Sequence, residues 1–321
     1  MRGNQRIITL NAAFLGICHQ IRHITPIMSD MSTIAFRKMN GLGNDFVVVD
    51  LRASAVSFTP NIVRAIANRE TGIGCDQFIL IEHPRAGGAG GAGGDCFMGI
   101  RNADGGEVEA CGNAARCVVS LMLEETGKQQ VTVETLGGIT QGWRTANGDI
   151  TVDMGIPKFD WQDIPLSEEI QDTRGIELQI GPIDDPILHT PAVVNVGNPH
   201  AIFYVDDADA YDLEQIGPLL ENHPMFPERA NISLAQTLSR NHIRLRVWER
   251  GVGQTRACGT AACAAAVTSA RKRLTERNVT VTLPGGDLEV HWREADDHIL
   301  MTGPATLDFE GTLDPRFFEA A

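Results

Sequence analysis

The sequence predicts an α/β (α+β) protein of two pseudo-symmetric domains from a tandem duplication, each a strand-rich sheet or barrel around a central helix. Two Cys-Gly pairs, at Cys111 and Cys258, each follow a polar turn and precede a helix-prone run. Similar strand segments follow both runs in the same order. Cys111 and Cys258 lie 147 residues apart, and Gly138 and Gly286 lie 148 apart. Such collinear matches indicate duplicated units, and we expect the active site in the cleft between them.

The chain of 321 residues is long enough for two domains. We expect a first domain at 32–154 with the tail 304–321 returning to it, and a second at 155–303. Residues 1–31 differ from the rest of the chain. From Met1 to Ser29 they contain arginines but no aspartate or glutamate. A targeting segment is one explanation. Asn11 interrupts the apolar run and no cleavage site follows, so we favour a disordered or spurious extension.

The first domain contains apolar runs that are separated by turn residues, a pattern typical of strands. We expect a helix at 60–68, with Thr59 as the N-cap and Pro60 in the first position. The low-complexity segment 84–94 predicts a flexible loop. We expect the strands of this domain at 33–39, 46–50, 78–82 and 97–102. After the helix that begins at Cys111, residues 131–138 predict a strand that runs into a Gly-Gly turn, and the segments 139–144 and 149–157 follow.

The second domain repeats the pattern. Residues 193–207 predict a strand-turn-strand unit that carries Asn198 and His200 at the junction, and Asn231 stands just before another strand. The strand starting at Ile243 ends in Glu249, and a glycine-rich turn then leads to Cys258. After the helix we expect strands at 279–286, 288–293 and 297–304.

Composition excludes several classes of function. The formal charge of -14 argues against nucleic acid as a partner, and no apolar run is long enough to span a bilayer. Seven cysteines, an odd number without framework spacing, indicate reduced thiols in the cytoplasm. The spacings around Cys111 and Cys258 lack accompanying histidines and do not resemble a zinc site. Neither a G-x-G-x-x-G after a strand nor a P-loop is present, so we expect no cofactor.

The cysteines divide into two groups. Cys117 and Cys263 lie inside apolar helical runs, which favours burial as small hydrophobic residues. Cys111 and Cys258 have polar lead-ins and an adjacent glycine, which favours function. Because unsatisfied N–H groups at a helix start favour negative charge, we expect these two thiols to ionise more readily than an ordinary thiol.

Three classes of function compete for two such thiols. A redox pair would usually carry Cys-x-x-Cys in one turn, and a binding module would not need the cysteines. Inversion of a stereocentre needs a base on one face of a carbon and an acid on the other. Two facing thiols from duplicated domains supply that pair, and two helix starts would stabilise the developing carbanion through the α-carboxylate.

Seven segments together resemble the diaminopimelate epimerase family over residues 33–314. They are MNGLGNDFVVVD, NRETGIGCDQ, RNADGGEVEACGNAARC, GNPH, FPERANI, RVWERGVGQTRACGTAACAAAV and LPGGDLEVHW. The resemblance implies an isomerase that interconverts LL- and meso-2,6-diaminopimelate without a cofactor, on the route to lysine and peptidoglycan.

The resemblance also assigns roles to residues. Cys111 and Cys258 match the catalytic cysteines, and His200 and Glu249 match positions that tune the thiols. Residues that match substrate-binding positions are Asn44, Gln77, Asn102, Asn198, Asn231, Glu249 and Arg250. Backbone amides that hold the reacting carboxylate are implied at Gly112, Asn113, Gly259 and Thr260.

The alternative is a proline or hydroxyproline racemase-type epimerase, which also uses two cysteines. That type usually has Cys-Gly-His in the first half, whereas this chain has Cys-Gly-Asn at Cys111. We therefore expect a small amino-acid substrate as the partner, with no nucleic acid and no membrane. A homodimer is one assembly open to the chain.

Overall fold

The computed structural model describes residues 34–85 and 93–319. The extension expected at 1–31 and residues 86–92 of the glycine-rich loop lie outside this range. Within it, no helix is both long and apolar enough to cross a membrane.

The first repeat runs from residue 35 to residue 153. Its elements are β1 (Ala35–Gly41), β2 (Asn44–Asp50), α1 (Pro60–Ala67), β3 (Gln77–Glu82), β4 (Cys96–Asn102), β5 (Glu107–Val108), α2 (Gly112–Thr126), β6 (Gln130–Thr135), β7 (Gly138–Arg144) and β8 (Ile150–Asp153). The predicted cap of α1 is confirmed, because the Thr59 hydroxyl accepts a hydrogen bond from the backbone of Ile62.

The second repeat runs from residue 192 to residue 303. Its elements are β11 (Ala192–Asn195), β12 (Pro199–Tyr204), η2 (Ala208–Ala210), α3 (Leu213–Glu221), β13 (Asn231–Ser239), β14 (His242–Glu249), β15 (Gly253–Thr255), α4 (Gly259–Arg271), β16 (Asn278–Leu283), β17 (Gly286–Trp292) and β18 (Ile299–Gly303). The short pair β9 (Gln179–Ile180) and β10 (Leu188–His189) precedes it, and β19 (Thr306–Thr312) and η3 (Pro315–Phe318) follow.

The two repeats have the same strand pairing. In the first, β1–β2, β3–β4, β6–β7 and β7–β8 are antiparallel, while β2–β3 and β4–β6 are parallel. In the second, β11–β12, β13–β14, β16–β17 and β17–β18 are antiparallel, while β12–β13 and β14–β16 are parallel. The predicted duplication is therefore confirmed by topology as well as by sequence.

The repeats are joined through β8 and β18, which pair antiparallel. Asp153 pairs with Leu300, and Val152 pairs with Met301. At the offset of 148 residues, Asp153 corresponds to Met301 and Val152 corresponds to Leu300. Exchanging the two repeats therefore turns one pair into the other. The register at this seam is thus the one that a pseudo-two-fold relation between the repeats requires.

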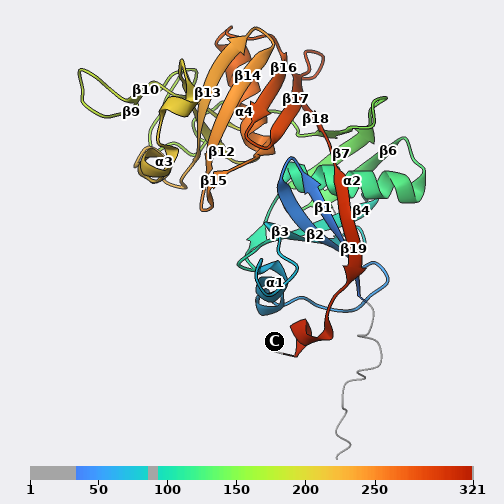
Figure 1. The fold of residues 1–321 in the computed structure, drawn as a ribbon. Helices are drawn as coiled ribbons and strands as arrows, with labels where there is room; N and C mark the ends of the chain where they lie inside the picture. The colour runs from blue at the N-terminus through green and yellow to red at the C-terminus, as the bar shows by residue number, and fades with distance from the viewer. Residues whose placement is uncertain (1–33, 86–92, 320–321) are drawn as a thin grey trace, which may run out of the picture. The chain divides into compact units, whose positions relative to one another are not determined.

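Helices α2 and α4 are the central helices of their repeats (Figure 1). Helix α2 contacts β1, β6, β7 and β8, and α4 contacts most strands of the second repeat. Most residues of both helices are buried, and Cys117 and Cys263 are fully buried in one shared apolar core. The expected core role of these two cysteines is confirmed.

Several elements lie outside the sequence predictions, among them α3, β19 and η3. Helix α3 contains Pro218, which obscures its pattern, and η3 is a single short turn. Strand β19 has mostly exposed side chains, so it lacks the alternation of a half-buried strand. It pairs antiparallel with β1, and Figure 1 shows the red β19 beside the blue β1. The domain boundaries at 154 and 303 stay predictions.

Candidate active site

Cys111 and Cys258 are the N-cap residues of α2 and α4. Both have extended backbone angles, with φ of -148° and -131°, and neither side chain forms a capping hydrogen bond. Each carbonyl accepts the first helical hydrogen bond, from Ala115 at 2.9 Å and from Ala262 at 3.1 Å. The expectation that each thiol stands where a helix begins is confirmed, and a helix start of this kind favours a bound anion.

The two helix starts lie against the same methionine. A Cβ added to Gly112 would come within 2.8 Å of Met301 Cε and 3.0 Å of Met154 Cε. A Cβ added to Gly259 would come within 2.8 Å of Met301 Sδ and 3.2 Å of Asn113 Oδ1. A side chain at either glycine would therefore meet Met301, and one at Gly259 would also meet Asn113 at the start of the other helix.

Three predicted polar residues of the first repeat stand at strand ends. Gln77 at the start of β3 and Asn102 at the end of β4 are register partners, and Gln77 Nε2 donates to Asn102 Oδ1 at 3.1 Å. Asn44 at the start of β2 donates to Asp76 Oδ2 at 2.9 Å and accepts from Asn113 Nδ2 at 3.3 Å. These hydrogen bonds connect the β1–β2 hairpin with the start of β3 and the start of α2.

The predicted residues of the second repeat form a matching group. His200 is fully buried in β12, and its Nε2 lies 2.7 Å from Asn198 Oδ1 and 3.5 Å from Asn231 Nδ2. Asn231 Oδ1 accepts from the backbone of Arg250 at 2.9 Å. The Arg250 guanidinium donates to the carbonyl of Glu228 at 3.0 Å. Asn231 therefore connects the start of β12 with the end of β14.

Strand register makes these two groups structural equivalents. Phe46 pairs with Gln77 as His200 pairs with Asn231. In the first repeat Gln77 pairs with Asn102. In the second repeat Ile232 pairs with Trp248, so Asn231 lies opposite Glu249 at the next position of these antiparallel strands. Asn231 therefore corresponds to Gln77, and Glu249 corresponds to Asn102. The repeats thus differ in charge at the site, because titratable His200 and Glu249 stand where the first repeat has Phe46 and Asn102.

Burial dominates the acidity of both thiols. It raises the pKa of Cys111 to about 11, against the lowering effect of the backbone N–H groups of Ala114 and Asn113. Burial also raises the pKa of Cys258 well above its usual value, and the Glu249 carboxylate raises it further. The expectation that the helix starts make these thiols more acidic than usual is therefore wrong, because removing a thiolate from water costs more than the helix ends return.

The neighbouring titratable groups are also shifted by burial. Burial raises the pKa of Glu249, while hydrogen bonds from Thr255 and the Cys258 thiol oppose that change. Burial, followed by the charge of Arg250, lowers the pKa of His200 to about 3, so its ring is neutral at ordinary pH. Thr260 Oγ1 lies 3.4 Å from Cys258 Sγ.

Two predicted site residues carry unused polar atoms. Within residues 34–85 and 93–319, Gln77 Oε1 and His200 Nδ1 are buried without a hydrogen-bond partner. Because such atoms cost free energy unless something pairs with them, they mark positions where a bound molecule would be stabilised.

Sequence reasoning missed Asp76, which orients Asn44. Asp76 accepts hydrogen bonds from the Asn44 side chain and from the backbone of Asp45, and Arg69 forms an ion pair with it at 2.6 Å. The signal in the sequence that could have identified Asp76 is its position, an acidic residue directly before the strand that begins with Gln77.

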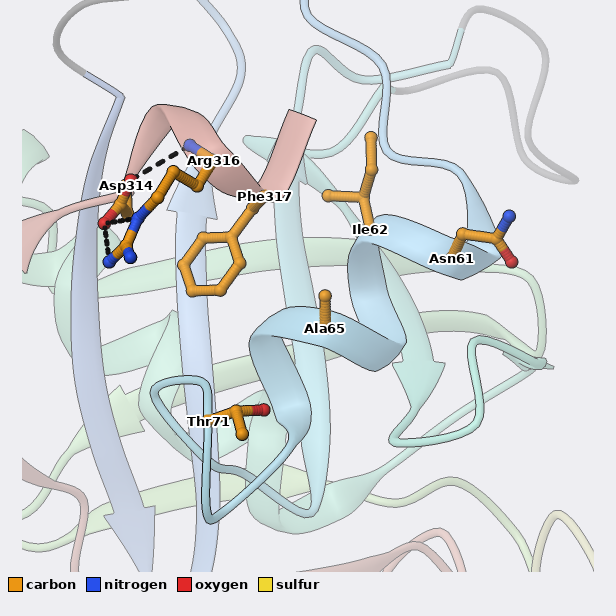
Figure 2. Close-up of a pocket in the computed structure, with 7 residues that line it drawn as sticks. All are labelled: Asn61, Ile62, Ala65, Thr71, Asp314, Arg316 and Phe317. Atoms are coloured by element: carbon orange, nitrogen blue, oxygen red, sulfur yellow. Dashed lines mark hydrogen bonds and ion pairs between the residues drawn. The ribbon is translucent and has the colours of Figure 1, made fainter. Parts of the chain in front are cut away.

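A cavity of about 220 Å³ lies elsewhere, between α1 and η3 (Figure 2). It is lined by Asn61, Ile62, Ala65, Thr71, Asp314, Arg316 and Phe317. None of the predicted site residues lines it, so it is separate from the two thiols.

The match to known proteins covers both repeats. The family model described as diaminopimelate epimerase matches residues 36–159 and 192–307, which span β1 to β8 and β11 to β18. The chain belongs to the diaminopimelate epimerase family. The family predicted from the sequence motifs is therefore confirmed.

Relatives of this family are similar over nearly the whole chain. Diaminopimelate epimerases of Rhodopseudomonas palustris and Afipia carboxidovorans are 57% and 55% identical to it, over 92% and 91% of this chain and 98% and 99% of theirs. Two solved structures with a similar fold are more distant in sequence. A hydroxyproline epimerase from Agrobacterium vitis has a TM-score of 0.60 at 13% identity, over 88% of this chain and 94% of that one. A phenazine biosynthesis protein from Bacillus anthracis has a TM-score of 0.59 at 17% identity, over 88% and 100%. These structures share the fold alone.

Proposed function

We propose that this protein epimerises LL-2,6-diaminopimelate to meso-diaminopimelate without a cofactor, through proton transfer at the α-carbon by Cys111 and Cys258. The observation that carries the proposal is the pair of cysteines that begin α2 and α4, with both helix starts against Met301. One thiolate removes the α-proton and the opposite thiol supplies a proton to the other face.

The α-carboxylate is held by the open backbone N–H groups that follow each cysteine, at Gly112, Asn113, Gly259 and Thr260. These dipoles stabilise the carbanion as charge develops on the carboxylate. The raised pKa of each buried thiol makes its thiolate a strong base, which suits a carbon acid as weak as the α-position of an amino acid.

Glu249 is suited to take the proton of Cys258. Its charge raises the pKa of the Cys258 thiol, and burial raises the pKa of its own carboxyl. His200, neutral at ordinary pH, orients Asn198, because its Nε2 donates to Asn198 Oδ1 at 2.7 Å. We assign both residues to tuning of the thiols.

The remaining polar residues bind the two amino-acid ends of the substrate. They are Asn44, Gln77, Asn102, Asn198, Asn231, Glu249 and Arg250. A proline ring needs fewer hydrogen-bonding partners, which disfavours the proline-racemase alternative. We infer a cytoplasmic role in lysine and peptidoglycan precursor biosynthesis, with a homodimer as the assembly to test.

Exchange of the α-proton in D2O tests the mechanism. Wild-type protein given one isomer should place deuterium mainly in the opposite product. Cys111→Ala and Cys258→Ala should each lower epimerisation at least about 1,000-fold. The Cys111→Ser and Cys258→Ser variants should keep traces of exchange from opposite isomers, because an alcohol donates a proton but is a poor base at neutral pH.

The matched control is Cys117→Ala, a core cysteine six residues along the chain from Cys111, which should keep the wild-type rate per folded molecule. Turnover that survives the loss of either Cys111 or Cys258 contradicts the two-thiol mechanism. Exchange of the same isomer by both serine variants contradicts it as well.

A further inference from the structure

Arg116 is a buried charge that the proposed reaction leaves unexplained. It lies on α2 five residues after Cys111 and is fully buried. We propose, on the basis of the proposed function, that Arg116 is a positioning residue that fixes the side chain of Asn113 between the two repeats and places a positive charge beneath Cys111.

The contacts of the guanidinium support this role. Its Nη1 donates to Asn113 Oδ1 at 3.1 Å, and its Nε donates to the carbonyl of Pro304 at 3.2 Å. In the part of the chain that the structure describes, Nη2 is buried without a partner. A buried arginine is normally paired with an acid, whereas these partners are neutral.

Arg116 determines which way the Asn113 amide points. Because Asn113 Oδ1 accepts from Arg116, its Nδ2 is directed outward, to Asn44 Oδ1 at 3.3 Å and to the carbonyl of Ala257 at 3.3 Å. Ala257 directly precedes Cys258. One buried guanidinium therefore connects the start of α2 to the residue before the second thiol.

The hydrogen bonds continue in one direction. Asn44 Oδ1 accepts from Asn113, so Asn44 Nδ2 is the group that donates to Asp76 Oδ2 at 2.9 Å. This series of hydrogen bonds begins at the Arg116 cation, passes through the amides of Asn113 and Asn44, and ends at the Asp76 carboxylate. Each amide has only one orientation that satisfies both neighbours.

Gly41 leaves space for the guanidinium. A Cβ added to Gly41 would lie 2.9 Å from Arg116 Nη2. Position 116 corresponds to Cys263 in the second repeat at the 147-residue offset of the catalytic cysteines. The cation is thus peculiar to the first repeat.

The charges that face Cys111 come from several elements. Arg116 on its own helix lowers the pKa of the thiol, and Glu249 on β14 raises it. Cys258 at the start of α4 is coupled to it. Arg116 itself is faced by Cys111, Cys117, Cys263 and Asp149. Removing the guanidinium leaves the opposing effect of Glu249 on Cys111 in place.

Two variants separate charge from geometry. Arg116→Met removes both, so kcat should fall about 10- to 100-fold with a smaller change in KM. The pH midpoint for alkylation of Cys111 by iodoacetamide, followed by mass spectrometry, should rise by about one unit. Arg116→Lys keeps the charge but cannot hold Asn113 and Pro304 together, so it should keep the midpoint and lose kcat.

The matched control is Arg271→Met on α4, where the arginine donates to Thr173 and lies over Phe159. It stands 12 residues along the helix from Gly259, about 18 Å, and should change neither kcat nor the midpoint. A folded Arg116→Met with the wild-type midpoint overturns the proposal, as does Arg271→Met with the same shift. If Arg116→Met does not fold, Arg116→Lys with wild-type kcat overturns it.

The alkylation readout needs no substrate. Wild-type protein that fails to epimerise diaminopimelate would reject the proposed function. A raised Cys111 midpoint in Arg116→Met would still support the role of Arg116 beside that thiol.

Discussion

At the scale of single residues, the two thiols have the same backbone setting but different neighbours. The charge of Glu249 acts on Cys258, while the equivalent of Glu249 in the first repeat is the neutral Asn102. Burial raises the pKa of both thiols, and Glu249 adds to the effect at Cys258. The pair is therefore electrostatically unequal despite the duplication.

Glu249→Gln should make the protein more stable at pH 8. The pKa of Glu249 is raised in the folded state, so its contribution to stability is present below the unfolded pKa and is lost as pH rises through the folded value. Glutamine resembles the protonated acid and avoids that loss. Denaturant unfolding of both proteins from pH 4.5 to 8 measures the difference, which should grow with pH.

The control is Glu124→Gln, at an exposed glutamate on α2. The difference in unfolding free energy between Glu124→Gln and wild type should not grow with pH as it does for Glu249→Gln. A Glu249→Gln protein that is less stable than wild type at pH 8 would show that the buried carboxylate is not the destabilising group. The alkylation midpoint of Cys258 should also fall in this variant, because the carboxylate no longer opposes ionisation.

At the scale of elements, the tip of the β1–β2 hairpin lies on the turn between β16 and β17. A Cβ added to Gly285 would come within 2.0 Å of the Leu42 carbonyl oxygen. Gly285 also donates its N–H to the carbonyl of Arg256 at 2.8 Å, two residues before Cys258. The hairpin that carries Asn44 is thus held against the loop that carries the second thiol.

Gly285→Ala should lower both stability and activity. The added methyl group meets backbone rather than a movable side chain, so the hairpin or the turn must shift, at a cost of about 1–3 kcal/mol. Unfolding free energy and kcat measure the two effects. Gly99→Ala on β4 is the control, because its nearest contact would be an ordinary 3.4 Å to Leu80 Cβ. Equal effects from both substitutions would contradict this account.

At the scale of the whole molecule, the seam between β8 and β18 joins the repeats through both backbone and side chains. The hydroxyl groups of Thr151 and Thr302 lie 2.7 Å apart across it. The apolar core that contains α2 also contains α4, and Ile34–Ala321 forms one compact unit. We expect the repeats to unfold together.

Thr151→Val and Thr302→Val test that seam. Each substitution should cost about 1 kcal/mol, because it deprives the other hydroxyl of its partner. The double variant should cost less than the sum, with a coupling of about 0.5–1.5 kcal/mol. Calorimetry and denaturant unfolding should give one transition in all four proteins. Additive losses, or a separate transition for one repeat, would contradict a shared seam.

Local patterns determined much of this protein in advance. The offset of 147 residues between Cys111 and Cys258 predicted the duplication, and turn residues before each Cys-Gly predicted the helix starts. The apolar surroundings of Cys117 and Cys263 predicted their burial. These features depend on residues within a turn or two, or on a repeat within the chain, so they are readable without coordinates.

The tertiary structure decided the acidity of the thiols, the equivalence of Asn102 with Glu249, and the position of Arg116 below Asn113. The local helix start favoured a more acidic thiol, but burial by distant segments reversed the direction. Arg116 reaches Pro304, 188 residues away, and Asn113 reaches Ala257, 144 residues away. Desolvation and long-range hydrogen bonds depend on which remote segments fold together, and no local pattern specifies that.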